Sequence, residues 1–456
     1  MNTVSVSDVI GRSRLGGLQL RVVALCTLCM IVDGFDVQAM GYVAPAIIGD
    51  WGIQKADLGT VFGAALLGMT LGALVMGMVA DRFGRRPVLI AAMLCLALTS
   101  FATAQAASVE ELRWMRFLTG LCMGAIVPNA VALAGEFSPA RVRITLMMVA
   151  SSGFILGGAL GGVVAGLLIP AYGWHAVFLA GAAAPLLLGV AMLALLPESL
   201  QYLTVRGRKL EQVRRWLVRI EPDLTMRDDT ILAAADRPAR GAPILELFRG
   251  TMAVATPLLW LLNFMNLLAA YFLANWLPVI MTEAGHPASA AVMVGTIFWV
   301  GGLVGNLLLG WLVDRHGFGP TLAINLLAGA LGVALIGQVS GSLGIAGAVI
   351  AVAGFCILGG QSALNALAAA FYPTPVRSTG AGWALGIGRL GSIFGPVIGG
   401  ELMRLNWSTA DLLVVAAIPC LIALAGNLLL WALGRLPRTA GSTAGALPPQ
   451  PARSRT

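Results

Sequence analysis

Two aspartates, Asp33 and Asp36, stand three residues apart in the segment IVDGFDVQAM, inside an apolar run that extends from Val22 to Ile48. A carboxylate at the centre of a membrane helix costs roughly 2.5–3.5 kcal/mol on insertion scales, and charges retained there usually serve a function. At this spacing both side chains lie on one face of a helix. Two neighbouring carboxylates shielded from water favour protonation of at least one, so the pair is a candidate proton-binding site.

The composition is that of a polytopic membrane protein. Of the 456 residues, 58% are hydrophobic and 11% are charged, whereas soluble domains carry about 25% charged residues. The apolar runs have the length of about 20 residues that a membrane-spanning helix needs, and barrel strands are shorter and alternate. We expect no cleavable signal peptide, because the polar, basic start runs straight into an apolar helix. Cys26 and Cys29 form a CxxC spacing, but within an apolar helix we expect packing residues and no metal site.

We expect twelve transmembrane helices, six on each side of a polar stretch. Their predicted positions are near residues 20–48, 56–79, 88–107, 113–136, 144–168, 173–197, 251–282, 291–313, 320–340, 343–371, 378–402 and 411–434. With both termini inside, 24 of the 29 basic residues fall on the cytoplasmic side and only Lys55, Arg113 and Arg404 on the other. This asymmetry follows the positive-inside rule and predicts a multi-pass membrane protein with both termini in the cytoplasm.

These spans predict five parts of the chain. They are a cytoplasmic amino-terminal segment (1–19), a six-helix bundle (20–198), a cytoplasmic linker (199–250), a second six-helix bundle (251–436) and a disordered cytoplasmic tail (437–456). Within the linker, LEQVRRWLVRI (210–220) is either an amphipathic helix on the inner leaflet or part of a simple tether with short helices.

The two halves share a motif. GMVADRFGRRP (77–87) and GWLVDRHGFGP (310–320) match at five of eleven positions, 233 residues apart. Duplicated six-helix units are typical of secondary transporters. We expect the glycines to allow close helix approach, Asp81 to lie near a helix N-terminus, and the charges to hold one access state closed. The candidate gate residues are Gly77, Asp81, Arg82, Arg85, Asp314, Arg315 and Arg377.

The Gly77–Pro87 motif resembles the loop signature of the major facilitator superfamily. RFLTGLCMG (116–124) is similar to the superfamily's fourth-helix pattern, and PES (197–199) is similar to the end of its sixth helix. The resemblance covers about residues 20–437 and implies an all-α polytopic membrane protein with twelve transmembrane helices in two six-helix bundles.

Three further stretches resemble the aromatic acid:proton symporters of that superfamily. They are DGFD (33–36), PNAVALAGEFSP (128–139) and NFMNLLAAYFLANWLP (263–278). The resemblance implies a protein of a bacterial inner membrane that imports a benzoate-like aromatic carboxylate together with protons. GSIFGPVIGG (391–400) has the spacing of a drug-antiporter motif, but it falls on the eleventh helix instead of the fifth, so we interpret it as a close-packing glycine face.

Few other ionisable groups remain at membrane depth. Arg116 is a candidate counter-ion for the aspartates, since the resemblance implies that the first and fourth helices are neighbours. The aspartates and Arg116 either couple transport to protons or form a permanent structural pair, and both roles can coexist. Glu136 is a proton relay or a gate ion pair. Arg389 is expected near the midplane, where its guanidinium either binds the carboxylate of the substrate or neutralises an aspartate of the opposite half.

Aromatic and amide side chains could complete a substrate pocket. An aromatic acid needs apolar walls and one or two donors, although amides at membrane depth also serve as hydrogen bonds between helices. The candidates are Tyr271, Asn275, Trp276, Gln361, Asn365 and Trp383.

The predicted function is proton-coupled import of an aromatic carboxylate by a monomer in the lipid bilayer. We expect no enzyme activity, cofactor, metal or nucleic-acid partner. No nucleotide motif is visible, and intramembrane aspartyl proteases carry their aspartates on separate helices with a GxGD pattern. A proton-independent facilitator, a sensor of organic acids and a symporter for another small carboxylate remain alternatives.

Overall fold

The computed structural model describes residues 3–207, 210–221, 231–233, 244–250, 252–373, 376–405 and 407–436. The long helices of the amino-terminal half are α2 (Gly17–Trp51), α3 (Lys55–Phe83), α4 (Arg85–Ala104), α5 (Val109–Gly124), α6 (Ile126–Phe137), α7 (Arg143–Tyr172) and α8 (His175–Leu195). Those of the carboxy-terminal half are α11 (Met252–Glu283), α12 (Ala288–His316), α13 (Phe318–Val339), α14 (Leu343–Gly354), α15 (Gly360–Phe371), α16 (Arg377–Arg404) and α17 (Thr409–Ala432).

These helices confirm the all-α polytopic architecture. Within the described ranges, eleven stretches are long and apolar enough to cross a membrane, with α5 and α6 forming one stretch and α14 and α15 another. The helix α2, taken with the short α1 (Val6–Arg12) that precedes it at a bend of 98°, makes a twelfth. Helix ends reach several residues beyond the predicted spans, because polar residues such as Asp81 and Arg82 continue α3 beyond the apolar run.

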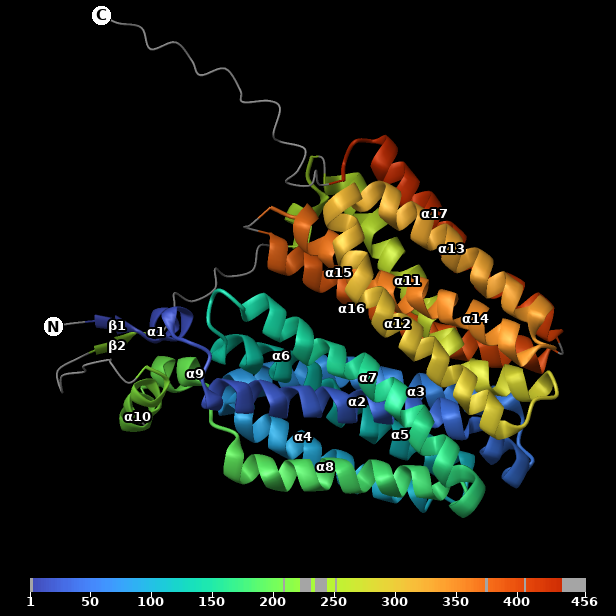
Figure 1. The fold of residues 1–456 in the computed structure, drawn as a ribbon, viewed down its shortest axis with the longest axis horizontal. Coiled ribbons are helices and arrows are strands. Elements are labelled where there is room, and N and C mark those ends of the chain that lie inside the picture. Colours follow the sequence, from blue (N-terminus) through green and yellow to red (C-terminus); the bar gives the residue numbers. More distant parts are fainter. Residues whose placement is uncertain are drawn as a thin grey trace, which may run out of the picture.

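Each half is a bundle with its own dominant helix pairs (Figure 1). In the amino-terminal half α2 packs on α7, α3 on α5, and α4 on α8; in the other half α11 packs on α16, and α13 on α17. The two halves meet mainly where α3 lies against α16 and α7 against α12, with α2 beside α11.

Glycines allow the closest of these contacts. A Cβ built on Gly34 of α2 would lie 1.9 Å from the carbonyl oxygen of Phe154 on α7, and one on Gly157 would lie 2.0 Å from that of Ile31. On α16, a Cβ at Gly391 would lie 2.1 Å from the Phe264 carbonyl oxygen. These positions therefore require glycine for backbone contact, as we expected for the glycine face of 391–400.

The halves are joined at one end of the molecule. Gly59 of α3 faces the backbone of Gly400 on α16, and Lys55 forms an ion pair with Glu283. We call this end the Lys55 end. The loops that carry Arg82, Arg141 and Arg315 lie at the other end, which we call the arginine-rich end. There, a Cβ on Gly77 or Gly310 would meet nothing within 4 Å. The structure is thus closed at the Lys55 end.

Short elements cover the arginine-rich end of the amino-terminal half (Figure 1). They are β1 (Thr3–Ser5), which pairs in parallel with β2 (Ile231–Ala233), then α1, α9 (Leu200–Val205) and α10 (Leu210–Ile220). The 3-10 turn η1 (Ile244–Phe248) instead packs against α11 and α16 of the carboxy-terminal half. The predicted helix at 210–220 is α10, and its Val213 and Leu217 are buried in a cluster with Val6 and Ile10 of α1. The tail at 437–456 lies outside the described residues.

One helix of the carboxy-terminal half contains an irregular turn. Between α14 and α15 the chain forms a π-helical turn, η2 (Phe355–Gly359). Amides from neighbouring helices bind its carbonyl oxygens: Asn266 donates to Ile357 at 3.0 Å and Asn325 to Cys356 at 2.8 Å. Such turns often mark functional positions in helices.

Candidate functional site

Asp36 is held in a buried ion pair. Its carboxylate accepts a hydrogen bond from Arg116 at 2.9 Å and another from Ser100 at 3.0 Å, while the second guanidinium nitrogen of Arg116 donates to the Asp36 carbonyl at 2.9 Å. Arg116 is 1% exposed, and its guanidinium also lies 5.7 Å from the ring centre of Phe178. Arg116, the candidate counter-ion, therefore pairs with Asp36, and its part in proton coupling stays a prediction. The contacts of Ser100 and Phe178 were not anticipated.

Asp33 has a different environment on the same face of α2. It is fully buried, and within the described part of the chain neither carboxylate oxygen has a hydrogen-bond partner. Two charged groups act on it electrostatically, the carboxylate of Asp36 and the guanidinium of Arg389. Because Gly34 lets α7 pack directly on α2, the DGFD segment both supplies the two acids and keeps water from them.

Arg389 brings the other half of the molecule to this point. It lies on α16, half-buried, and its charge acts both on Asp33 of α2 and on Tyr271 of α11. We call Asp33, Arg389 and Tyr271, which are coupled electrostatically across three helices, the Asp33 cluster.

A small cavity lies next to this cluster. Arg116, Tyr271, Asn275, Met40 and Phe62 are among its lining residues, which come from α2, α3, α5 and α11. Its volume of about 10 Å³ is close to the minimum for a single water. An aromatic acid therefore needs side chains here to move apart.

Amides of the carboxy-terminal half form one continuous network. Gln361 of α15 donates to Asn263 at 3.0 Å and to Asn365 at 2.9 Å, and accepts from Asn266 at 2.9 Å. Gln361 thus bonds between helices to Asn263 and Asn266, which is the alternative to a substrate role that we considered for these amides, whereas its bond to Asn365 lies within α15.

Three predicted substrate residues have other contacts. Trp276 is fully buried, donates to the Pro396 carbonyl at 2.9 Å and packs edge-on against Phe62 across the halves. Trp383 is 44% exposed and stacks on Trp260, in the part of α16 nearer the arginine-rich end. Asn275 donates to the Tyr271 carbonyl but still reaches the small cavity. These placements favour Asn275 over the two tryptophans as part of a site at the small cavity.

Glu136 belongs to a network at the arginine-rich end. Its carboxylate pairs with Arg85 at 2.9 Å and accepts from the Ser199 hydroxyl. This ion pair at the end of α6 favours a gate role for Glu136 over that of a proton relay, the other alternative. Beside it, Glu198 accepts from the backbone N–H groups of Arg85 and Arg86 at 3.0 and 3.1 Å and so caps the start of α4.

Two expectations for the loop motif are wrong in this conformation. The acid at the helix N-terminus is Glu198 and not Asp81, whose side chain is exposed. Gly84, at φ 104°, turns the chain there, and its missing side chain leaves room for Glu198. Gly77 and Gly310 face open space, so neither makes the close approach that we expected.

The remaining gate candidates have local contacts. The Arg82 carbonyl accepts from the Tyr202 hydroxyl at 2.8 Å, the Arg315 guanidinium lies over the Trp311 ring, and Arg377 donates to the Tyr372 carbonyl. Asp314 is exposed. The Lys55–Glu283 pair at the opposite end was missed, because neither residue stands in a recognisable motif. In the ranges that the structure describes, no group of three His, Cys, Asp or Glu residues could hold a metal ion.

Comparisons with known proteins agree with this architecture. A family model described as "Major Facilitator Superfamily" matches residues 26–249 and 259–454. The chain is 41% identical to the 4-hydroxybenzoate transporter PcaK of Pseudomonas aeruginosa over 93% of this chain and 95% of the relative. It is 36% identical to the gallate transporter of Pseudomonas putida over 92% and 93%, and 32% identical to the benzoate transport protein of Acinetobacter baylyi over 92% and 91%.

Solved structures share the fold at low identity. An inward-facing bacterial homologue of the human lysosomal transporter Spinster matches with a TM-score of 0.73 and 17% identity, covering 94% of this chain and 100% of that one. The inward-open xylose transporter XylE from E. coli matches with a TM-score of 0.70 and 17% identity, covering 92% and 98%.

Proposed function

The chain belongs to the Major Facilitator Superfamily, and on that premise we propose that it imports an aromatic carboxylate together with a proton. It is a multi-pass membrane protein, and the relatives just described are named as transporters and not as enzymes. Their named substrates, 4-hydroxybenzoate, gallate and benzoate, all join an aromatic ring to a carboxylate. A benzoate-like acid is therefore the proposed cargo.

Asp33 is the proposed proton acceptor, and its environment is the observation that carries the proposal. A fully buried carboxylate without a hydrogen-bond partner is costly in its charged form and stable when protonated. Asp36 is the opposite case, because Arg116 and Ser100 hold its charged form. Asp33 thus gains and loses the proton, while the Asp36–Arg116 pair keeps α2 and α5 in place.

Arg389 couples the proton to the substrate. When Asp33 is ionised, its carboxylate and that of the substrate compete for the same guanidinium charge. Protonation of Asp33 removes this competitor, so Arg389 binds the incoming carboxylate through charge-assisted hydrogen bonds. Tyr271, which lines the small cavity and is coupled electrostatically to both charges, supplies an aromatic wall and a hydroxyl.

Alternating access uses the asymmetry of the two ends. We assign the arginine-rich end to the cytoplasm because basic residues accumulate there. With contacts concentrated at the Lys55 end, the structure then represents a state open to the cytoplasm. In the opposite state the arginine-rich loops close, and the Arg85–Glu136 and Glu198 contacts rearrange.

The decisive experiment is uptake of labelled 4-hydroxybenzoate, benzoate and gallate into proteoliposomes, with and without an inward proton gradient. We expect accumulation of at least one acid only with the gradient. Asp33→Asn should lose this accumulation but keep exchange of labelled for unlabelled acid. Arg389→Gln should lose both, and Asp57→Asn, a change at an acid in the first turn of α3, serves as the matched control.

Three results would contradict the proposal. Uptake that ignores the gradient identifies a proton-independent facilitator, and binding without uptake identifies a sensor. Gradient-driven accumulation retained by Asp33→Asn removes Asp33 as the proton site. Transport of aliphatic carboxylates in preference to aromatic ones would instead identify a symporter for another small carboxylate.

A further inference from the structure

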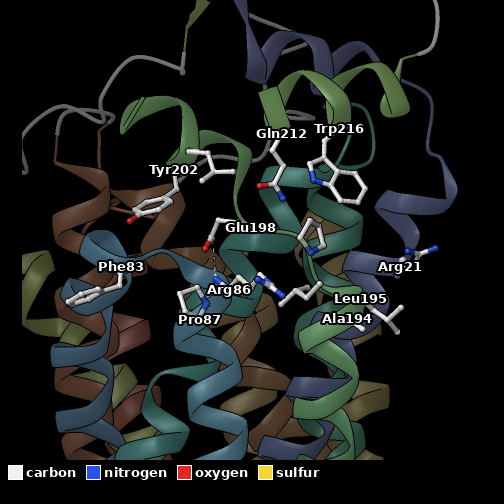
Figure 2. Close-up of a pocket in the computed structure, with 13 residues that line it drawn as sticks. Arg21, Phe83, Arg86, Pro87, Ala194, Leu195, Glu198, Tyr202, Gln212 and Trp216 are labelled. Carbon is white, nitrogen blue, oxygen red and sulfur yellow. Dashed lines mark hydrogen bonds between the residues drawn. The ribbon is translucent and has the colours of Figure 1, made fainter. Parts of the chain in front are cut away.

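A cavity of about 580 Å³ opens on the flank of the amino-terminal half at the arginine-rich end (Figure 2). Its floor is the start of α4 and the end of α8, and the residues of α9 and α10 cover it. It is separate from the Asp33 cluster, and of its lining residues Glu198, Arg86 and Tyr202 take part in the gate contacts described above. Its lining includes Arg21, Arg86, Leu195, Tyr202, Gln212 and Trp216.

The cavity presents positive charge. Arg86 uses one guanidinium nitrogen to donate to the Leu193 carbonyl, while its buried Nε has no hydrogen-bond partner among the described residues. Arg21 is exposed at the rim. Glu198 also reaches the cavity, but one of its oxygens accepts from three backbone N–H groups, those of Arg85, Arg86 and Ser199. With two guanidinium groups against one carboxylate, the lining carries a net positive charge.

A second cavity of about 280 Å³ extends this positive surface. It is lined by residues of the α2 start together with Arg219 and Ile220 at the end of α10, and it shares Arg21 with the first cavity. The two cavities thus place Arg21 between Arg86, which lines the first cavity, and Arg219, which lines the second.

An apolar surface leads away from the cavity along the membrane. On the outer face of α8, Leu187 is 71% exposed, Val190 55% and Leu193 52%, and Leu195 continues this face to the cavity wall. At the covering side, Trp216 and Gln212 point toward the cavity from α10 (Figure 2). Tryptophan is enriched where hydrocarbon meets head groups. The arginines, Trp216 and the apolar face of α8 therefore match the phosphate, the interfacial region and the acyl chains of a phospholipid in that order.

We propose that this cavity binds an anionic phospholipid of the cytoplasmic leaflet, with the phosphate between Arg21 and Arg86 and the acyl chains along α8. Basic pockets at the cytoplasmic side of transmembrane helices suit phosphate head groups. The continuous apolar face of α8 favours a lipid over a free phosphate or nucleotide, which would use only the arginines. Bound lipid joins α10 of the linker to α4 and α8, so it fastens the linker to the amino-terminal half.

The test measures lipid contact at Trp216 in the full-length protein. The protein is reconstituted in unlabelled phosphatidylcholine, and a brominated lipid is added in increasing amounts. In one series this lipid is phosphatidylglycerol and in the other phosphatidylcholine, each brominated near the carbonyl end of its acyl chains. Bromine quenches nearby tryptophans, and the difference between the wild type and Trp216→Phe isolates the signal of Trp216. We expect phosphatidylglycerol to quench at a lower mole fraction than phosphatidylcholine, and Arg21→Gln to weaken this preference about fivefold, the effect of one basic residue at an anionic surface.

The matched control is Arg141→Gln, which removes an exposed arginine of the same end outside both cavities. It should keep the wild-type preference, whereas Arg21→Gln with Arg86→Gln should abolish it. Equal quenching by the two lipids, or equal effects of Arg21→Gln and Arg141→Gln, would overturn the proposal. Displacement of the phosphatidylglycerol signal by inorganic phosphate would also overturn it and would identify a site for a soluble anion.

Discussion

Asp33 of α2 and Asn266 of α11 are 233 positions apart, the same offset that separates Gly77 from Gly310 in the repeated motif. One half therefore has a carboxylate where the other has an amide. Around Asp33 the amino-terminal half buries a second acid and an arginine, whereas around Asn266 the carboxy-terminal half has the buried Asn263 and the partly buried Gln361. The duplicated fold has kept the depth of the polar residues and separated their chemistry: charge in one half, neutral hydrogen bonds in the other.

The two loop motifs differ in the same way. In the first copy, Glu198 accepts from the N–H groups that begin α4, and Glu136 pairs with Arg85. In the second copy Phe318 begins α13 without a side-chain cap, and a neutral amide, that of Asn427, donates to the Gly319 carbonyl at 3.0 Å. The charged positions of the gate are therefore unequal between the halves, which a motif comparison alone does not reveal.

Breaking the buried charge of the amino-terminal half should have the largest effect. Arg116→Gln leaves Asp36 as an uncompensated buried carboxylate, and removing one member of such a pair costs about 3–5 kcal/mol. We expect a marked fall in the unfolding temperature in detergent and loss of transport. Arg113→Gln, a change at a partly exposed arginine of the same helix that donates only to Thr60 among the described contacts, is the control. Equal stability of the two variants would refute the structural role of the pair.

The packing that encloses these charges should come next. Gly34→Ala places a methyl group 1.9 Å from the Phe154 carbonyl oxygen, and overpacking of this kind costs about 1–3 kcal/mol. Gly77→Ala adds the same methyl group in open space and should leave thermal stability in detergent unchanged. If Gly34→Ala proves as stable as Gly77→Ala, direct contact of α2 and α7 at this point is wrong.

The amide half should respond more weakly and in a different property. Asn266→Ala removes the donor to Ile357 and Gln361. We expect the free energy of substrate binding to weaken by about 1–1.5 kcal/mol, which is roughly a tenfold lower affinity, because the network shapes the site. Proton-driven accumulation should persist in transport assays. An Asn266→Ala protein uncoupled from the gradient, as expected of Asp33→Asn, would show that the two halves do not divide the work.

The smallest effect is expected at the cap of α4. Glu198→Gln keeps an oxygen acceptor but removes the charge opposite the helix N-terminus, an interaction of about 0.3–1 kcal/mol. We expect a two- to fivefold slower transport rate with unchanged affinity, measured as initial uptake. Asp81→Asn, in the same motif but exposed, is the control. A larger effect of Asp81→Asn would restore Asp81 as the capping residue.

Sequence reasoning was successful where the physics is local. Hydropathy predicts the spans because a helix must satisfy its own backbone in lipid, and the i, i+3 spacing places Asp33 and Asp36 on one face. It could not separate their roles, because the partners of Asp36, Arg116 and Ser100, come from 80 and 64 residues away. The same limit applies to Trp383, whose stacking on Trp260 depends on how α11 crosses α16, and to Glu198, whose capping role depends on where α8 ends.

The π-helical turn at Phe355–Gly359 has a consequence for how the following helix faces the rest of the molecule. A π turn inserts one residue into the α-helical repeat, and one residue corresponds to a rotation of about 100° around the helix axis. The side chains of α15 are therefore out of phase with those of α14, and this phase shift is what directs Gln361 toward Asn263 and Asn266. The polar face of this span is thus set by chain length as much as by residue type, and a single-residue deletion within the turn would swing Gln361 away from its partners while every amide remained in the sequence.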